Sequence, residues 1–512
     1  MSNTWHRGLG AKNLAALAVE KGGEQNRPLF ECDDGREFTF REFWDMAGRF
    51  AAAFAKAGAV RGDRIAAQVD KSVEALAAFW ACARGGFVFL PLNTAYTPAE
   101  VSYFLNDAAP HVFLVSPAKR AELEGVARAA NCLHLLTLDD RGGGTLIEQS
   151  QKLDPFEHQG TGWDDLVAIL YTSGTTGRSK GAMLSHGNLA SNALALVETW
   201  EFTPDDCLIH ALPVYHTHGL FTATNTLLLS GGRMLFRRKF DADDVMRLLP
   251  RATCLMGVPT FYTRLLQHPA LTRAATAHIR LFVSGSAPLL AETHRAFSER
   301  TGQAILERYG MTETSMNASN PYSGDRRPGS VGLPLPHISV RVADPVTHVA
   351  LPVETDGMIE VSGPNVFKGY WRNPEKTAED FTQDGWFVTG DLGRISEDGY
   401  VTISGRAKDL VITGGFNVYP KEVEELIDAL PGVAESAVIG LPHGDFGEAV
   451  TVVVVPEQGA VLDEAAILAA IRPKLAGFKL PKRVFVVDAL PRNAMGKVQK
   501  AELRRSYAST YQ

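Results

Sequence analysis

From about residue 38 to 150, and again from 166 to 284, segments with strand patterns alternate with segments with helix patterns. This alternation limits the possible folds more than any other feature of the chain. Short apolar runs such as 112–116 and 207–211 fit buried strands, whereas 39–57 repeats apolar residues at helical spacing. Strands that alternate with helices form parallel βαβ units with both sheet faces covered. The sequence therefore predicts an α/β fold.

The later part of the chain has a different pattern. Four short strands are predicted at 338–343, 358–362, 386–389 and 400–404. They indicate a small antiparallel sheet or barrel packed on the α/β body. Because 512 residues exceed the roughly 250–300 that one core can serve, we expect two domains. The prediction is a large N-terminal domain of βαβ subdomains with a β-barrel-like part (1–406), and a small, mobile α+β domain (407–512).

The composition excludes several classes of protein. The 51 basic and 58 acidic residues give a net charge of -7, which argues against binding to nucleic acid through bulk charge. The five cysteines form no Cys-x-x-Cys pair, so a zinc ribbon or a disulfide scaffold is not expected. No stretch reaches the ~20 apolar residues that a membrane span needs, and the N-terminus lacks the apolar core of a signal peptide. We expect a cytoplasmic protein without membrane or nucleic-acid partners.

A run rich in glycine and hydroxyl groups follows the strand predicted at 166–171. It reads Tyr-Thr-Ser-Gly-Thr-Thr-Gly-Arg-Ser-Lys-Gly over 171–181. Glycines let the backbone approach a ligand, hydroxyls and amides can surround phosphate oxygens, and Lys180 adds positive charge. The spacing is not that of a Walker A loop, and the Gly-x-Ser-x-Gly match lies inside a longer loop. A phosphate loop leading into a helix is predicted, with a solvated turn as the alternative.

The segment 307–313 reads Glu-Arg-Tyr-Gly-Met-Thr-Glu. Gly310 permits a turn, and Tyr309 offers a flat face on which a base can stack. Glu313 is a hard oxygen ligand of the kind that suits Mg²⁺, which binds few carboxylates and keeps several waters. The alternative is a helix that begins with an acidic first turn.

Two further motifs place charged groups in turns. Asp391 follows a predicted strand and can accept both hydroxyls of a ribose, with Arg406 as a second polar group nearby. The alternative is an ordinary ion pair in a turn. Near the C-terminus, Lys497 lies on a glycine-bearing turn from which its side chain can reach into a site.

These four motifs, in this order and spacing, resemble the adenylate-forming superfamily of acyl-CoA synthetases, luciferases and peptide-synthetase adenylation domains. The resemblance covers about residues 30–505, and Ser179 departs from it because the family usually has proline there. It implies a two-step reaction that uses ATP, Mg²⁺ and coenzyme A. A carboxylate attacks the α-phosphate of ATP, giving acyl-AMP and pyrophosphate, and a thiol then displaces AMP.

The resemblance also implies a role for individual residues. The implied ATP-binding residues are Thr172, Ser173, Gly174, Thr175, Thr176, Gly177, Lys180, Ser286, Ala287, Glu307, Arg308, Tyr309, Thr312, Asp391, Arg406 and Lys497. The implied catalytic residues are Lys497, Thr312, Glu313 and His216, with Glu313 as the Mg²⁺ ligand. Lys497 would bridge the attacking carboxylate and the α-phosphate.

The same resemblance implies a moving domain. Lys408 would be the hinge, and rotation would exchange the Lys497 face for the face that meets coenzyme A. That second face is Gly414, Gly415 and Phe416. Acetylation of Lys497 by a lysine acetyltransferase would remove the charge that the first step needs.

In the superfamily, three segments usually line the pocket for the acid, and here they correspond to 210–220, 256–260 and 279–289. They contain three histidines and an arginine, which would be unusual in an apolar tunnel for a fatty acid. A second carboxylate on the substrate would need a buried cation. The runs HALPVYHTHGL (210–220), MGVPTFYTRLL (256–266), RLFVSGSAPL (280–289) and ERYGMTET (307–314) resemble the malonyl-CoA synthetase group. That resemblance implies malonate as the acid, with methylmalonate tolerated. It assigns the distal carboxylate to Arg280 and the pocket wall to His216. The alternative for Arg280 is a structural role at a strand end, and His210 and His218 are predicted to be hydrogen-bonded core residues.

Other functions remain open at this point. One is a CoA ligase for another short or aryl carboxylic acid. Another is a protein that forms or binds an adenylate, or loads a carrier protein, without using coenzyme A. A luciferase-like oxygenation also fits the motifs. A panel of acids, scored by AMP release that depends on coenzyme A, separates these functions.

Overall fold

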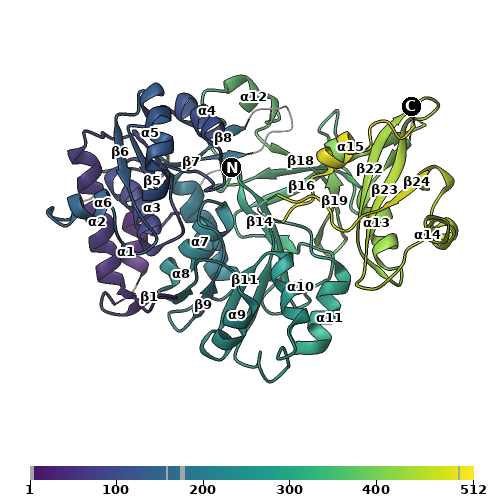
Figure 1. Ribbon diagram of the computed structural model, residues 1–512, viewed down its shortest axis with the longest axis horizontal. Coiled ribbons are helices and arrows are strands. Elements are labelled where there is room, and N and C mark those ends of the chain that lie inside the picture. Colours follow the sequence, from purple (N-terminus) through teal and green to yellow (C-terminus); the bar gives the residue numbers. More distant parts are fainter. Residues whose placement is uncertain are drawn as a thin grey trace.

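The computed structural model describes residues 5–22, 24–156, 160–172, 179–414, 416–493 and 496–511. An α/β body occupies most of the molecule, and a smaller C-terminal unit lies to one side of it (Figure 1). The predicted calls on Ser173, Gly174, Thr175, Thr176, Gly177 and Gly415 fall outside the described residues.

The first part of the body is a six-stranded sheet in the order β6-β5-β3-β4-β7-β8. Its strands are β3 (Arg64–Gln68), β4 (Val88–Pro91), β5 (Val112–Val115), β6 (His134–Thr137), β7 (Leu166–Thr172) and β8 (Lys180–Ser185). All neighbours are parallel except β7 and β8, which pair antiparallel. The expectation that the phosphate loop leads directly into a helix is therefore wrong, because β8 intervenes before α7 (His186–Thr199).

The second part is a nine-stranded sheet in the order β15-β14-β13-β12-β11-β9-β10-β1-β2. Its strands are β1 (Pro28–Cys32), β2 (Glu37–Thr39), β9 (Cys207–His210), β10 (Arg233–Phe236), β11 (Cys254–Gly257), β12 (Leu281–Ser284), β13 (Leu306–Met311), β14 (Ser315–Ser319) and β15 (Leu333–Pro334). The stretch from β1 to β13 is parallel, and the strands at the two edges are antiparallel. The segment 307–313 thus ends a strand and opens a hairpin, and the helical alternative is wrong.

Helices cover these sheets. They are α1 (Leu14–Lys21), α2 (Phe40–Lys56), α3 (Val73–Gly85), α4 (Pro98–Ala108), α5 (Arg120–Ala129), α6 (Thr145–Ser150), α7, α8 (Thr224–Ser230), α9 (Ala242–Leu248), α10 (Pro259–Gln267) and α11 (Ala291–Thr301). Local sequence sets their ends: Thr39 and Glu42 form a reciprocal capping box at the start of α2. A π-helical turn, His218–Ala223, precedes α8, and such turns are frequent at functional sites.

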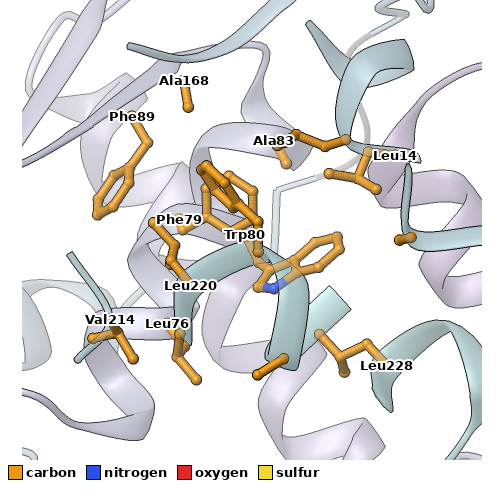
Figure 2. Close-up of a cluster of buried hydrophobic side chains, with 14 of the residues drawn as sticks. Leu14, Leu76, Phe79, Trp80, Ala83, Phe89, Ala168, Val214, Leu220 and Leu228 are labelled. Carbon is orange, nitrogen blue, oxygen red and sulfur yellow. The ribbon is translucent and has the colours of Figure 1, made fainter. Parts of the chain in front are cut away.

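A buried apolar cluster joins the two sheets. Figure 2 shows side chains from α1, α3, α8, β4, β7 and the π-helical turn meeting around Phe79 and Trp80 of α3. The ring of Phe79 lies 5.9 Å from that of Phe89 on β4 and 5.2 Å from that of Phe221 in the turn, measured between centroids. Because one side chain contacts both halves of the body, the halves share one core.

Two smaller sheets complete the chain. The first is antiparallel, in the order β16 (Ser339–Ala343), β17 (Gly357–Ser362), β18 (Phe387–Ile395) and β19 (Val401–Arg406), with α12 (Pro374–Glu379) beside it. The second lies in the C-terminal unit and comprises β20 (Val411–Thr413), β21 (Phe416–Val418), β22 (Val433–His443), β23 (Gly447–Pro456) and β24 (Arg483–Val486), with α13 (Pro420–Asp428), α14 (Glu464–Ile471) and α15 (Lys500–Ser506). This unit has apolar clusters of its own. The predicted fold class is confirmed.

All five cysteines are buried and unpaired. Among the described residues, no helix combines the length and the apolar character needed to cross a membrane.

We predict that Phe79→Ala lowers the free energy of unfolding by about 3–5 kcal/mol, because it leaves a cavity where the two sheets share a core. Urea unfolding followed by fluorescence measures the change. Leu133→Ala, at a side chain that is 76% exposed, is the matched control and should leave the transition within about 0.5 kcal/mol. Equal effects from the two substitutions would contradict the role given to Phe79.

Candidate active site

Residues from the two large sheets meet where their strands end. One small cavity is lined by Pro91 and Tyr171, at the ends of β4 and β7, and by His216 and Thr312, from the loops after β9 and β13. In parallel α/β sheets, ligands bind outside the carboxyl ends of the strands. The motifs around these residues, far apart in the sequence, therefore converge on one region.

At one end of this region, an aromatic and ionic network holds the predicted ribose site. The Tyr309 hydroxyl donates a hydrogen bond to Asp391, whose other carboxylate oxygen lies 2.6 Å from Nε of Arg406. Burial raises the pKa of Tyr309, so the hydroxyl keeps its proton. Asp391 and Arg406 also face each other in the register of β18 and β19. The ion pair named as the structural alternative is present, and it holds the carboxylate in one orientation.

Two of the predicted phosphate-binding residues, Thr172 and Lys180, lie at the end of β7 and at the start of β8. They pair with each other across the two strands. The ammonium of Lys180 lies 5.2 Å from the ring centroid of Tyr370. The Tyr103 hydroxyl donates to the carbonyl of Ser179 at 2.7 Å and so ties α4 to the residue that precedes β8.

Glu313 is buried, and burial raises the pKa of its carboxyl group. The Tyr370 hydroxyl donates to its Oε1 at 3.2 Å. Tyr370 therefore contacts both the predicted phosphate lysine and the predicted Mg²⁺ ligand. The sequence pattern did not reveal this residue, because nothing near Tyr370 marks it as different from other buried tyrosines.

The described residues contain no cluster of three or more histidine, cysteine, aspartate or glutamate side chains that could hold a metal by themselves. A single carboxylate at Glu313 fits Mg²⁺, which takes most of its ligands from phosphate oxygens and waters when it binds with a nucleotide.

Arg308 is the most unusual charged residue of the site. It is buried on β13, and its Nε and Nη2 atoms have no hydrogen-bond partner within the described ranges of the chain. Burial lowers its pKa to about 9, so the guanidinium remains charged at neutral pH. It lies against Gly285, where an added Cβ would be 2.3 Å from Cζ of Arg308. Glycine at 285 is therefore required for the arginine to occupy this place.

Two buried histidines belong to this region, and the charge of Arg308 acts on one of them, His218. Among the described residues, Nε2 of His216 and Nε2 of His218 have no partner, while Nδ1 of His218 is 3.1 Å from the Ser286 hydroxyl. Burial and then the charge of Lys497 lower the pKa of His216 to about 4, and burial and then Arg308 lower that of His218. Both rings are neutral at pH 7. Four buried hydroxyls also have no partner in the described part of the chain: Thr217, Thr222, Ser284 and Ser315.

Lys497 reaches this region from the C-terminal unit. An added Cβ at Gly496 would be 3.6 Å from Cγ2 of Thr260, so the turn that carries Lys497 lies against α10 of the body. Desolvation, followed by the charges of Arg406 and Arg308, lowers the pKa of Lys497, while Asp391 and Glu313 oppose that shift. The amino group of Lys497 is therefore close enough to interact electrostatically with Asp391 and Arg406 at one end of the site and with Arg308 at the other.

Arg280 does not belong to this group, and its predicted role in binding the distal carboxylate is corrected here. It immediately precedes β12, at the amino end of the strand, whereas the site lies beyond the carboxyl end. Its Nε and Nη2 atoms form a bidentate ion pair with Asp206 at 2.7 and 2.8 Å. Nη1 donates to the carbonyl of Trp200. With its donors occupied, Arg280 has the structural role named as the alternative.

The remaining predicted residues lie around the site or on the C-terminal unit. Ser286 and Ala287 form the turn after β12, with Ser286 at a φ of 73°. The Glu307 carboxylate accepts from the Gly329 amide at 3.1 Å, and burial raises its pKa to about 7. Lys408 lies exposed in the 3₁₀ turn that separates β19 from β20. Gly414 and Phe416 are exposed on the C-terminal unit, where Phe416 stacks on Phe478 at 4.7 Å. His210 and His218 are buried and hydrogen-bonded, as predicted.

Known proteins share this arrangement. The ATP-bound MatB of Rhodopseudomonas palustris superposes with a TM-score of 0.96 at 57% identity, over 98% of this chain and 99% of that one. A malonate–CoA ligase of Arabidopsis thaliana is 34% identical over 92% of this chain and 85% of its own length. A feruloyl-CoA synthase of Amycolatopsis is 36% identical over 92% and 94%. The malonate–CoA ligase and the feruloyl-CoA synthase are about equally identical to this chain, so overall sequence identity does not indicate which acid it uses.

The pattern of the AMP-binding enzyme family matches residues 18–371, and that of its C-terminal domain matches 422–497. The first match alone covers more than half of the chain, and it contains the buried cluster around Arg308 and Glu313. The chain belongs to the AMP-binding enzyme family.

Proposed function

We propose that this protein ligates malonate to coenzyme A at the expense of ATP, with methylmalonate tolerated, and releases AMP and pyrophosphate. The observation that carries this proposal is the unpartnered guanidinium of Arg308. A buried charge without a partner is costly, and a carboxylate can satisfy two of its donors at once. A malonate molecule has one carboxylate to react and a second one to meet Arg308. We propose Arg308 in the place first given to Arg280.

The neighbouring groups suit a small, polar acid. The neutral rings of His216 and His218 and the hydroxyl of Ser284 offer hydrogen bonds without adding charge. A long apolar acid would leave these groups and Arg308 unsatisfied, and a site of this kind can reject such analogues by about 10⁴-fold. The polar lining supports malonate over the aryl acid suggested by the feruloyl relative.

In the first step, the reacting carboxylate attacks the α-phosphate of ATP. We assign the ribose to Asp391, the phosphates to Thr172 and Lys180, and the developing charge at the α-phosphate to Lys497. Such a division relies on positioning and on fixed charge, both of which the buried network supplies before the substrates arrive. Glu313, oriented by Tyr370, would hold Mg²⁺, which neutralises phosphate charge when it is bound.

The second step needs a different face of the C-terminal unit. We assign residues 1–406 and 407–512 to the two moving parts, with Lys408 at the hinge between them. Turning there would withdraw Lys497 and present Gly414 and Phe416 to coenzyme A. The exposure of Phe416 in the present arrangement supports this assignment. After the C-terminal unit rotates, coenzyme A could cover the exposed part of this ring.

We predict that Arg308→Met lowers kcat/KM for malonate by about a hundredfold to a thousandfold, because it removes the cation that pairs with the second carboxylate. The activity with acetate should change little. AMP release is measured with malonate, methylmalonate, acetate, octanoate and coumarate, each with and without coenzyme A.

Arg280→Met is the matched control for this substitution, since it also removes an arginine beside β12. It should lower thermal stability and leave the ratio of malonate to acetate activity unchanged. If Arg280→Met changes that ratio and Arg308→Met does not, the assignment is wrong. A preference for a monocarboxylate in the unchanged enzyme would refute malonate as the acid, and AMP release without a need for coenzyme A would refute the ligase.

We further predict that Lys497→Gln, which also mimics acetylation, slows formation of the acyl-AMP by about a hundredfold or more, because it removes a cation at developing charge. The second step should change less than about threefold, since Lys497 leaves the site before it. Malonate-dependent exchange of pyrophosphate with ATP measures the first step, and consumption of preformed malonyl-AMP measures the second. Equal slowing of both steps would contradict the assigned role.

A further inference from the structure

Lys71 connects the two halves of the body beside the acid-binding region. It lies in the loop between β3 and α3, immediately before Ser72, the N-cap of α3. Its amino group is 2.9 Å from the carbonyl of His210 and 3.0 Å from Nδ1 of the same residue, at the end of β9. It also lies 4.4 Å from the ring centroid of Phe236, at the end of β10. A residue in a loop that follows a strand of the six-stranded sheet thus contacts two strand ends of the nine-stranded sheet.

The contacts of His210 determine which of its nitrogens carries the proton. Nε2 of His210 is 3.0 Å from the carbonyl oxygen of Gly219, which can only accept a hydrogen bond. The single proton of the neutral ring therefore lies on Nε2, and Nδ1 is left to accept an N–H bond from the amino group of Lys71. The other tautomer would set the lone pair of Nε2 against the Gly219 oxygen.

Gly219 belongs to the π-helical turn that follows His216 and includes His218. The Thr224 hydroxyl also donates to its carbonyl, at 2.8 Å. On the other side, an added Cβ at Gly219 would be 2.1 Å from the Pro213 carbonyl oxygen, so the turn has no room to shift in that direction. Leu220 of the same turn packs in the cluster around α3, the helix that Lys71 precedes (Figure 2).

We infer that Lys71 is a positioning residue for the acid pocket, acting through the tautomer of His210 and the carbonyl of Gly219 on the turn that includes His218 and follows His216. The inference rests on the proposed function, because it takes the two histidines to line the acid site. It predicts an effect on binding of the acid and none on binding of the nucleotide.

The test uses the full-length protein and whichever acid of the panel it turns over best. Lys71→Met keeps a side chain of similar length over Phe236 but removes the donors. It should raise KM for the acid about tenfold, the effect of losing one well-placed hydrogen bond, while KM for ATP stays within about twofold. Lys71→Arg retains donors and should recover most of the loss.

Ser116→Ala is the matched control. The Ser116 hydroxyl donates to Asp70 at 2.9 Å and steadies the same loop without contacting His210. If Lys71 only stabilised the loop, Ser116→Ala and Lys71→Met would change the two KM values alike, and the inference would be overturned.

A spectroscopic measurement on the unchanged protein tests the tautomer directly, even if Lys71→Met does not fold. In NMR spectra of protein with nitrogen-labelled histidine, the His210 signal, assigned by its loss in His210→Gln, should report a neutral ring with the proton on Nε2. A proton on Nδ1 would overturn the inference whatever the kinetics show. The proposed function is tested separately by the panel of acids. It fails if the unchanged enzyme releases AMP faster with another acid than with malonate.

Discussion

The structure of the site depends on one buried charge that the protein itself does not neutralise. The guanidinium of Arg308 is buried in a central sheet, where its Nε and Nη2 atoms have no partner among the described residues, and its charge acts on the neutral His218. An isolated buried ion costs several kcal/mol, which the surrounding packing must offset. Gly285 gives the side chain its space, and the core shared by the two sheets supplies the stability. Under the function proposed above, the second carboxylate of the acid would relieve this cost, and the unfavourable feature of the free protein would be the basis of its selectivity.

Charge is arranged differently at the two ends of the same region. At the nucleotide end, Asp391 is already satisfied by Tyr309 and Arg406, and Glu313 accepts from Tyr370. These groups are fixed before a ligand binds, as electrostatic preorganisation requires. The acid end is left open and unpaired. Lys497, supplied by the other domain, feels charges from both ends, which fits a residue that acts where the acid and the α-phosphate meet.

The sequence predicted the α/β class, the antiparallel sheet and the separate C-terminal unit, because periodicity and length carry that information. It implied Arg308 as an ATP-binding residue and Arg280 as the partner of the distal carboxylate, whereas we propose Arg308 for that carboxylate. Arg280 precedes its strand, and in a parallel sheet that places it at the edge away from the ligand; this could have been reasoned from the sequence. The sequence alone could not show that two donors of Arg308 lack partners, because that result depends on every residue that surrounds Arg308 in the folded protein. Tyr370 and Lys71 were missed for the same reason, since their partners come from distant parts of the chain.

Relatives named for different acids are about equally similar to this chain, since the malonate–CoA ligase is 34% identical and the feruloyl-CoA synthase 36% identical to it. Overall identity therefore gives little information on the acid, and the choice of malonate depends on the local chemistry of the pocket. Asp391 and Glu313 each have protein partners, so a change at either position disturbs other side chains. Nε and Nη2 of Arg308 have no such partner among the described residues, and under the proposed function exchanging Arg308 would alter the preferred acid more than the binding of the nucleotide. Lys71, which we infer positions the wall of the acid pocket without lining it, adds a residue outside the pocket whose substitution can change the specificity.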